Sequence, residues 1–201
     1  MRFKDRQEAG VLLADKLKGY AGKDVVIYAV PRGGVVLGAE IARALKAPLD
    51  LVIVRKIGHP ANPEYAVGVT AENHDVLCNP AEKRSLDPKW LEKAIEEARQ
   101  EVIRRRKVYL GDRVRPDVAG KTAIVVDDGV ATGMTFVMAL RETRHLRPAK
   151  LVAAIPVLPA EMLPKIQKEA DEVVYLDAPE DFLGAVGAYY DEFPQVSDEE
   201  V

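Results

Sequence analysis

Two adjacent carboxylates, Asp127 and Asp128, come directly after the apolar run 123–126. Burial of ionised carboxylates without partners is costly, so we expect this pair at the end of a strand, facing water or a ligand. The next residues form a loop of mostly small side chains that opens a helix. Backbone N–H groups at a helix start bind anions, and hydroxyl groups add donors. This candidate anion site consists of Gly129, Val130, Ala131, Thr132, Gly133, Met134 and Thr135.

A phosphate cradle beside two carboxylates indicates a class of ligand. Carboxylates repel a phosphate directly, but they accept hydrogen bonds from sugar hydroxyls. A ligand that offers a phosphate to the loop and a diol to the acids is a ribose 5-phosphate. The alternative is an ordinary connection between a strand and a helix, with solvated aspartates.

Residues 125–135, with the sequence VVDDGVATGMT, closely resemble the motif that binds phosphoribosyl pyrophosphate (PRPP) in type I phosphoribosyltransferases. The motif combines two apolar residues, two acids and a final Thr-Gly-x-Thr, and its context is a strand followed by a helix. The resemblance extends over roughly residues 20–178. It implies a five-stranded parallel core with a hood over the site, and the tail 177–201 adds a hood-like element.

The resemblance also implies two groups of residues that bind pyrophosphate. Arg32, Gly33 and Gly34 fall at the family's pyrophosphate loop, where glycines permit close approach of a ligand and arginine offers a fixed fork of donors. The alternative is a plain turn with a surface arginine. Arg55 and Lys56 fall where the flexible catalytic loop begins, and two cations there would neutralise the leaving pyrophosphate. The alternative is an exposed basic strand end.

One position departs from part of the family. Members that act on hypoxanthine or guanine carry an aspartate just before Thr-Gly-x-Thr, whereas this chain has Ala131, which resembles the adenine-type pattern. If an acid or base is needed, Glu64 is the nearest candidate, although a plain surface glutamate is the alternative. Tyr189 and Tyr190 could stack on a flat base or, alternatively, anchor the tail to the core.

Apolar periodicity predicts the elements that position these residues. Strands that alternate with helices imply right-handed crossovers. We therefore predict an α/β fold, a doubly wound and mostly parallel five-stranded sheet with helices on both faces. The expected strands are 25–30, 51–54, 122–126, 151–155 and 173–176, and the expected helices are 5–17, 35–46, 87–111, 133–146 and 159–170.

Two segments depart from this alternation. Residues 57–80 contain several glycines and prolines between short alternating stretches, which predicts a β-ribbon or a mobile flap. Residues 177–201 concentrate aromatic side chains and are the candidate hood. We expect the whole chain, 1–201, to form a single phosphoribosyltransferase-like domain that includes both segments.

Composition excludes several other classes of protein. The 201 residues carry 29 basic and 32 acidic side chains, a net charge of −3, which argues against nucleic-acid binding. The longest apolar runs, about six residues, are too short to span a membrane. The charged N-terminus lacks the apolar core of a signal peptide, so we expect a cytoplasmic protein. One cysteine excludes an internal disulfide, and the histidines lack metal-ligand spacing.

The resemblance implies an enzyme of nucleotide metabolism and salvage. It would transfer the 5-phosphoribosyl group of PRPP to a nitrogenous base and release pyrophosphate. Mg²⁺ would arrive with PRPP, bound by substrate oxygens and water, with no dedicated protein cage. The implied partners are PRPP, a small-molecule base and a second copy in a homodimer. Two alternatives are a non-catalytic regulator that senses PRPP or nucleotides on the same fold, and a phosphoribosyl hydrolase.

Overall fold

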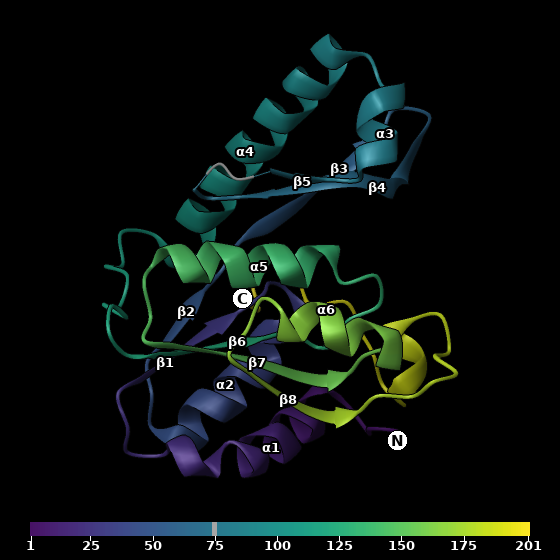
Figure 1. Cartoon of the computed structure of the whole chain (residues 1–201). Coiled ribbons are helices and arrows are strands. Elements are labelled where there is room, and N and C mark those ends of the chain that lie inside the picture. The colour runs from purple at the N-terminus through teal and green to yellow at the C-terminus, as the bar shows by residue number, and fades with distance from the viewer. Residues whose placement is uncertain (74–75) are drawn as a thin grey trace.

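A parallel five-stranded sheet with the strand order β2-β1-β6-β7-β8 forms the core of the computed structural model (Figure 1). The structure describes residues 1–73 and 76–201, with only the backbone at Glu64. Each neighbouring pair of core strands is parallel, so the predicted α/β fold is confirmed. The core strands are β1 Val25–Ala29, β2 Leu49–Leu51, β6 Thr122–Val126, β7 Lys150–Val157 and β8 Glu172–Asp177.

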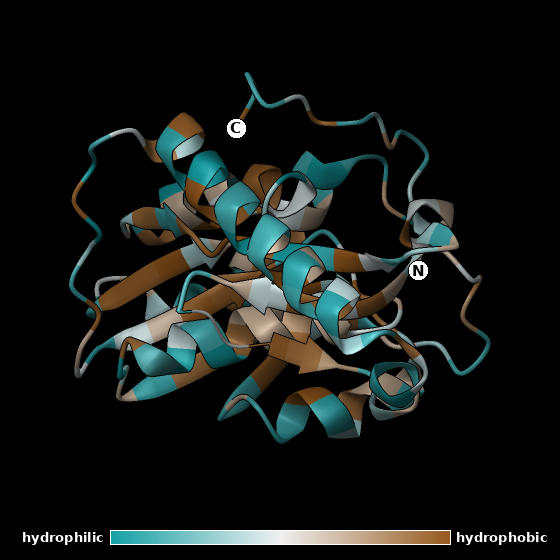
Figure 2. Cartoon of the chain, turned by 90° about the horizontal axis from the view of Figure 1, so that it is seen from above, coloured by the Kyte–Doolittle hydropathy of each residue, from teal (hydrophilic) through white to brown (hydrophobic). Residues whose placement is uncertain are grey.

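Helices cover both faces of this sheet. Alternate residues of a strand point to opposite faces, so each strand contributes side chains to both helix layers. Residues 25, 27 and 29 of β1 belong to one apolar cluster with α1 and α2, whereas 26 and 28 belong to another with α5 and α6. Two covered faces explain the continuous apolar runs of the strands, and Figure 2 shows hydrophobic residues concentrated along them. The helices are α1 Arg6–Lys16, α2 Gly33–Leu45, α5 Met134–His145 and α6 Leu163–Gln167.

Reciprocal hydrogen bonds form the start of α1. Asp5 Oδ1 accepts a hydrogen bond from the Glu8 N–H at 2.9 Å, and Glu8 Oε2 accepts one from the Lys4 N–H at 2.6 Å. The first bond is the one that the predicted capping box requires of its N-cap aspartate, whereas Glu8 accepts from Lys4 and not from the N–H of Asp5. The two hydrogen bonds fix the first turn of α1 and with it the position of Arg6.

The strand order brings two loops together at one edge of the sheet. The chain passes from β1 to β2 on one side and returns to β6 on the other, so the winding reverses between β1 and β6. Ligands of open parallel sheets bind at such a switch point, beside the carboxyl ends of the strands. The Val30 N–H donates to Val126 O at 2.9 Å, which places the loops after β1 and β6 side by side.

A second sheet, with three antiparallel strands, lies in the upper part of Figure 1. It contains the β-ribbon expected in residues 57–80. The predicted strand 51–54 is wrong in its bounds, because the chain leaves the core sheet after Leu51 and Val54 begins the ribbon. The short helix α3 was not predicted. These elements are β3 Val54–His59, β4 Asn62–Ala71, β5 Val76–Cys78, α3 Pro80–Ser85 and α4 Pro88–Leu110.

Four charged residues join the ribbon and α4 to the core sheet. Asp50 Oδ2 lies 3.7 Å from Arg106 Nη2 and 3.4 Å from Arg115 Nε. Glu72 pairs with the same two arginines, Oε1 to Arg106 Nη1 at 3.1 Å and Oε2 to Arg115 Nη2 at 2.7 Å. Asp50 is 4% exposed, so its charge requires these partners. The cluster therefore ties the base of the ribbon to β2.

The C-terminal tail returns to the N-terminal residues. The Phe3 N–H donates to Tyr189 O at 2.8 Å, and the Asp191 N–H donates to Phe3 O at 2.8 Å. Figure 1 shows the N-terminus beside this yellow segment. Among the described residues, no helix combines the length and apolar character needed to span a bilayer. The part of the chain that the structure describes also contains the short 3₁₀ helices η1 Lys18–Tyr20, η2 Ala160–Met162 and η3 Val186–Tyr189.

Candidate functional site

The two loops at the switch point touch each other. A Cβ atom at Gly33 would collide with the Asp128 carboxylate, and one at Gly34 would lie 2.8 Å from Val126 O. Neither glycine has a positive φ, and the Pro31–Arg32 peptide bond before them is cis. The sequence suggested that these glycines admit a ligand. In the structure they are required because the loop after β6 approaches them closely.

Asp128 is held from two sides by residues far away in the sequence. The Arg6 Nε donates to Asp128 Oδ2 at 2.8 Å, and the Tyr190 hydroxyl donates to the Asp128 backbone O at 2.6 Å. The side chains of Arg6 and Asp128 are only 9% and 16% exposed. The sequence placed Asp128 at the strand end but identified neither of its partners.

Asp127 has a different environment. Its Oδ1 accepts a hydrogen bond from the Asp128 N–H at 2.8 Å, which turns the carboxylate back toward its own loop. Burial raises the pKa of Asp127, and the negative charge of Asp128 raises it further. Burial also raises the pKa of Asp128, while Arg6 opposes that rise. The two carboxylates therefore differ in how strongly they stay ionised, and a ligand that brings positive charge would favour ionisation of both.

The loop after the acids has donors that face no protein acceptor. Within the described chain, no residue accepts a hydrogen bond from the N–H groups of 131–135, which lead into α5. The Val130 N–H is different, because it donates to Val157 O at 2.9 Å. Successive unpaired N–H groups at a helix start are suited to bind an anion. Residues 131–135 of the predicted loop thus retain this capacity.

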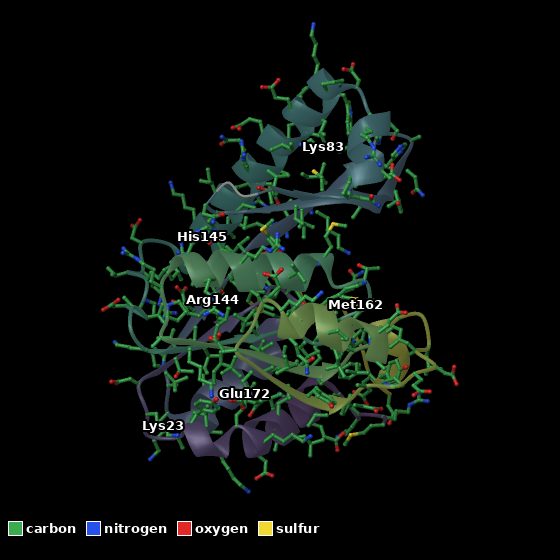
Figure 3. All side chains as sticks on the ribbon, viewed as in Figure 1. Lys23, Lys83, Arg144, His145, Met162 and Glu172 are labelled. Carbon is green, nitrogen blue, oxygen red and sulfur yellow. The ribbon has the colours of Figure 1, made fainter. Side chains whose placement is uncertain are left out.

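Two glycines let neighbouring side chains approach the loop. Gly129 and Gly133 have φ angles of +155° and +78°, a region that disfavours side chains. A Cβ atom at Gly129 would collide with Val186 of the tail, and one at Gly133 would collide with Met162. Figure 3 labels Met162, which precedes α6. The tail and η2 therefore cover part of the loop, while Thr132 stays exposed.

Arg32 is paired with an acid of the tail. Its Nη1 lies 3.5 Å from Asp198 Oδ1, and the Tyr109 hydroxyl of α4 donates to the same oxygen at 2.7 Å. The hydrogen bond from Tyr109 lowers the pKa of Asp198, with a further contribution from Arg32. The predicted pyrophosphate arginine thus faces a carboxylate that lies 166 positions away in the sequence.

Arg55 and Lys56 lie on the ribbon rather than beside the acids. Both are exposed on β3 and line a cleft of about 740 Å³ between the ribbon and α4. None of residues 127–135 lines that cleft. Within the described chain, neither cation forms an ion pair. The structure therefore leaves both positive charges available, but it does not bring them into contact with the predicted phosphate loop.

The remaining predicted site residues are Glu64, Tyr189 and Tyr190. Glu64 belongs to β4, and its side chain lies outside the described residues. Tyr189 and Tyr190 are only 4% and 3% exposed. The stacking interpretation of these two residues is wrong, because their rings pack against Phe182 and Phe3 within the protein. Their alternative interpretation, as anchors of the tail, describes their packing.

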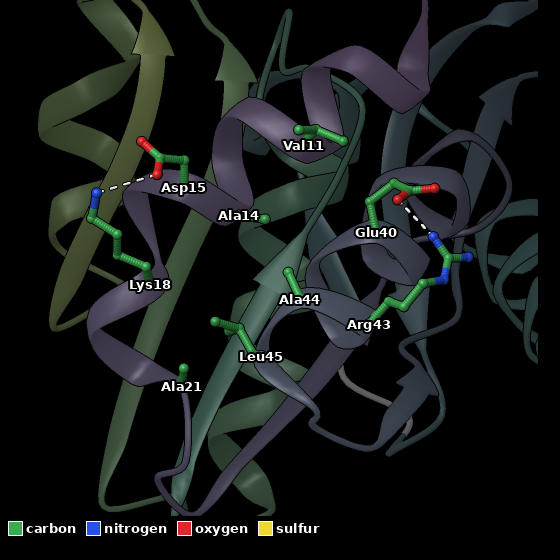
Figure 4. Close-up of a pocket in the computed structure, with 9 residues that line it drawn as sticks. All are labelled: Val11, Ala14, Asp15, Lys18, Ala21, Glu40, Arg43, Ala44 and Leu45. Carbon is green, nitrogen blue, oxygen red and sulfur yellow. Dashed lines mark hydrogen bonds and ion pairs between the residues drawn. The ribbon is translucent and has the colours of Figure 1, made fainter.

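A further hollow, of about 410 Å³, lies between α1 and α2 (Figure 4). Its charged residues already form ion pairs, Asp15 with Lys18 at 3.2 Å and Glu40 with Arg43 at 2.6 Å. None of residues 127–135 lines it, so we do not include it in the candidate site.

Comparisons with known proteins agree with the geometry. A family model described as a phosphoribosyl transferase domain matches residues 5–192. Two Mycobacterium tuberculosis proteins, from strains CDC 1551 / Oshkosh and H37Rv, are each named "Putative phosphoribosyl transferase" and are 39% identical over 201 residues, 99% of this chain. The chain spans 45% of the length of each of these relatives.

Two solved structures illustrate the fold. TT1426 from Thermus thermophilus has a TM-score of 0.82 and 40% identity, with 100% of this chain and 96% of that chain covered. A purine phosphoribosyltransferase from Pyrococcus horikoshii has a TM-score of 0.50 and 17% identity, with 96% of this chain and 93% of that chain covered. At that identity, the second likeness concerns the fold alone.

Proposed function

This chain belongs to the phosphoribosyl transferase family, and on that basis we propose that it transfers the 5-phosphoribosyl group of PRPP to a nitrogenous base. One observation carries the proposal: the N–H groups of residues 131–135, which have no acceptor among the described residues, lie at the same strand end as the Asp127 and Asp128 carboxylates. A ligand with a phosphate and a vicinal diol at opposite ends of one sugar satisfies both groups at once.

In the proposed reaction, a nitrogen atom of the base bonds to C1 of the ribose while the bond from C1 to the pyrophosphate oxygen breaks. The electron pair leaves with pyrophosphate, C1 becomes transiently cationic, and the proton released from the base nitrogen passes to a pyrophosphate oxygen or to water. Asp127 and Asp128 would accept hydrogen bonds from the ribose hydroxyls and favour that positive charge. The loop would hold the 5-phosphate, so that the reacting atoms meet in a fixed orientation.

Pyrophosphate would bind on the other side of the switch point. Arg32 supplies a rigid fork of donors there. The proposal includes closure of residues 57–80, which would bring Arg55 and Lys56 to the leaving group and exclude water that would hydrolyse PRPP. The same two cations are unpaired in the described chain, which supports their use by an anionic ligand.

We include Mg²⁺ in the proposal as an ion that PRPP brings with it. Among the described residues, no group of three or more acidic, histidine or cysteine side chains could hold a metal alone. The donors present fit an ion bound mainly by substrate oxygens and water, because Asp127 and Asp128 could each hold one of its waters. Such an ion would supply positive charge to the pyrophosphate.

The acceptor is proposed to be a base other than hypoxanthine or guanine, since Ala131 supplies no carboxylate beside it. The test is a screen of adenine, guanine, hypoxanthine, xanthine, uracil and orotate with PRPP and Mg²⁺, in which pyrophosphate release is measured. We expect release with at least one base. PRPP binding without release would favour the sensing regulator, and release without any base would indicate a hydrolase.

Asp127→Asn tests the site itself, with Asp15→Asn as the matched control. Asp15 is an exposed aspartate whose partner is Lys18. Loss of a charge that stabilises a transition state typically lowers turnover on the order of 100-fold. We expect that decrease for Asp127→Asn and wild-type turnover for Asp15→Asn. Equal turnover in the two variants would remove Asp127 from the mechanism.

A further inference from the structure

Arg6 occupies an unfavourable place for a cation. It is the first residue of α1, where the positive end of the helix dipole disfavours a positive side chain. It is also only 8% exposed, so its charge has lost most of its hydration. A buried arginine at this position requires strong interactions elsewhere in the protein.

Three contacts hold the guanidinium group of Arg6. Its Nε donates to Asp128 Oδ2 at 2.8 Å, and its Nη1 donates to Pro194 O at 2.6 Å. The Phe193 ring stacks on it, with 3.7 Å between Cζ and the ring centroid. Because the guanidinium group is planar and rigid, bonds through two nitrogens and one stacked face leave it a single orientation.

These contacts also restrict Asp128. Its carboxylate lies between Arg6 and the backbone of Gly33, and its backbone O accepts the hydrogen bond from Tyr190. The other titratable groups that face it are Asp127 and Tyr190, and neither supplies a positive charge. Within the described chain, Arg6 is therefore the cation that stabilises this carboxylate in its ionised form.

We propose that Arg6 is a positioning residue for phosphoribosyl transfer: it pairs with Asp128, keeps that carboxylate ionised, and directs it to accept hydrogen bonds from the ribose hydroxyls beside the Gly33 loop. The inference rests on the function proposed above. Arg6 acts through Asp128 and does not itself contact the reacting atoms. Since Phe193 and Pro194 complete its environment, the C-terminal tail takes part in the same arrangement.

Three variants of Arg6 distinguish its proposed effect on Asp128 from a contribution to stability alone. Arg6→Met removes the charge but keeps an apolar stem against Phe193, and Arg6→Gln removes the charge but keeps donors. Arg6→Lys keeps the positive charge but loses the planar set of N–H donors of the guanidinium group. The control is Arg2→Met, because Arg2 pairs with Asp191 on the surface, where the two side chains are 66% and 58% exposed.

The first readout is the pH profile of kcat/KM. Without Arg6 the pKa of Asp128 rises, so the acid limb moves to higher pH in Arg6→Met and Arg6→Gln. Each unit of that shift lowers kcat/KM on the acid limb about tenfold. Arg6→Lys should keep the wild-type limb with a lower kcat, and Arg2→Met should match the wild type. Lower thermal stability of the Arg6 variants with an unchanged acid limb would overturn the proposal.

The second readout needs no turnover. In ¹³C NMR titration of the carboxyl groups, Asp128 of the wild-type protein should lose its proton at lower pH than Asp127, and the titration of Asp128 should move to higher pH in Arg6→Gln. If transfer fails with every base, this titration still tests the pairing, and PRPP binding by calorimetry should weaken in Arg6→Gln. If no Arg6 variant folds, the wild-type titration decides, and ionisation of Asp127 before Asp128 overturns the proposal.

Discussion

Substitution Gly33→Ala should disrupt the contact between the two loops of the candidate site. The added Cβ atom would collide with the Asp128 carboxylate, and Arg6 Nε lies 2.9 Å from the same Cβ position. The carboxylate cannot move toward Arg6, because the two are already at hydrogen-bond distance, 2.8 Å. Asp128 must therefore turn away from its cation, or the loop that begins α2 must shift.

The loss of stability caused by Gly33→Ala has two sources, the steric overlap of the new Cβ atom and the separation of Asp128 from Arg6. Overpacking of a close contact typically costs about 1–3 kcal/mol. Separation of a buried ion pair costs about 3–5 kcal/mol when one charge is left without its partner. Asp128 keeps some access to water, since its side chain is 16% exposed, so we do not add the two costs in full. The substitution should lower the free energy of unfolding by about 3–5 kcal/mol, roughly 6–20 °C in Tm for a chain of this size.

Gly19→Ala is the matched control. Gly19 lies in η1, and a Cβ atom added there would meet no other atom within 4 Å. Urea unfolding and differential scanning calorimetry of the two variants give the comparison directly. Gly33→Ala should also bind PRPP more weakly, whereas Gly19→Ala should bind it as the wild type does. If Gly33→Ala is as stable as Gly19→Ala, the inferred contact between the loops is refuted.

Three further predictions concern charges around the site. Asp198→Asn removes the carboxylate 3.5 Å from Arg32, so Arg32 no longer has to leave that partner and pyrophosphate should bind more tightly in calorimetry. Unchanged or weaker binding contradicts this. Arg115→Met removes one of the cations beside Asp50, which is only 4% exposed. This substitution should lower the free energy of unfolding, measured in urea, by about 3 kcal/mol. An unchanged midpoint of urea unfolding would be inconsistent with a structural role for the cluster. Burial raises the pKa of Asp127, so the folded protein holds this proton more tightly than the unfolded chain, and the stability that this one proton contributes is lost as the pH rises above about 4. Asp127→Asn removes that loss, so its stability relative to the wild type should be greater at pH 8 than at pH 4; the same difference at both pH values would count against the raised pKa.

The elements of the core could be predicted because each depends on its own sequence. The strand 122–126 has the same bounds in the prediction and in the structure, since a short apolar run next to two acids has few alternatives. The ribbon was harder, because a strand boundary between Leu51 and Val54 depends on where the chain leaves the sheet. All four residues 51–54 are apolar, so composition contains no sign of that exit.

The residues of the candidate site also include some that could be predicted from local sequence and some that could not. Residues 127–135 are contiguous, and a strand end followed by a helix start places their carboxylates and N–H groups together without help from distant segments. Arg55 and Lys56 show the limit of this reasoning. Their position after an apolar strand suggested the start of a flexible catalytic loop at the end of a core strand, yet both belong to an antiparallel ribbon and line the cleft against α4.

The sequence alone determined the alternation of strands and helices, the loop of residues 129–135 and the acid pair before it, all of which arise from interactions between near neighbours. Only the tertiary structure decided which distant side chains meet them. Arg6 reaches Asp128 across 122 positions, and Asp198 reaches Arg32 across 166. The physical reason is that local preferences act within a few residues, whereas these pairs exist because the packed sheet and the returning tail bring both chain ends to the same strand ends.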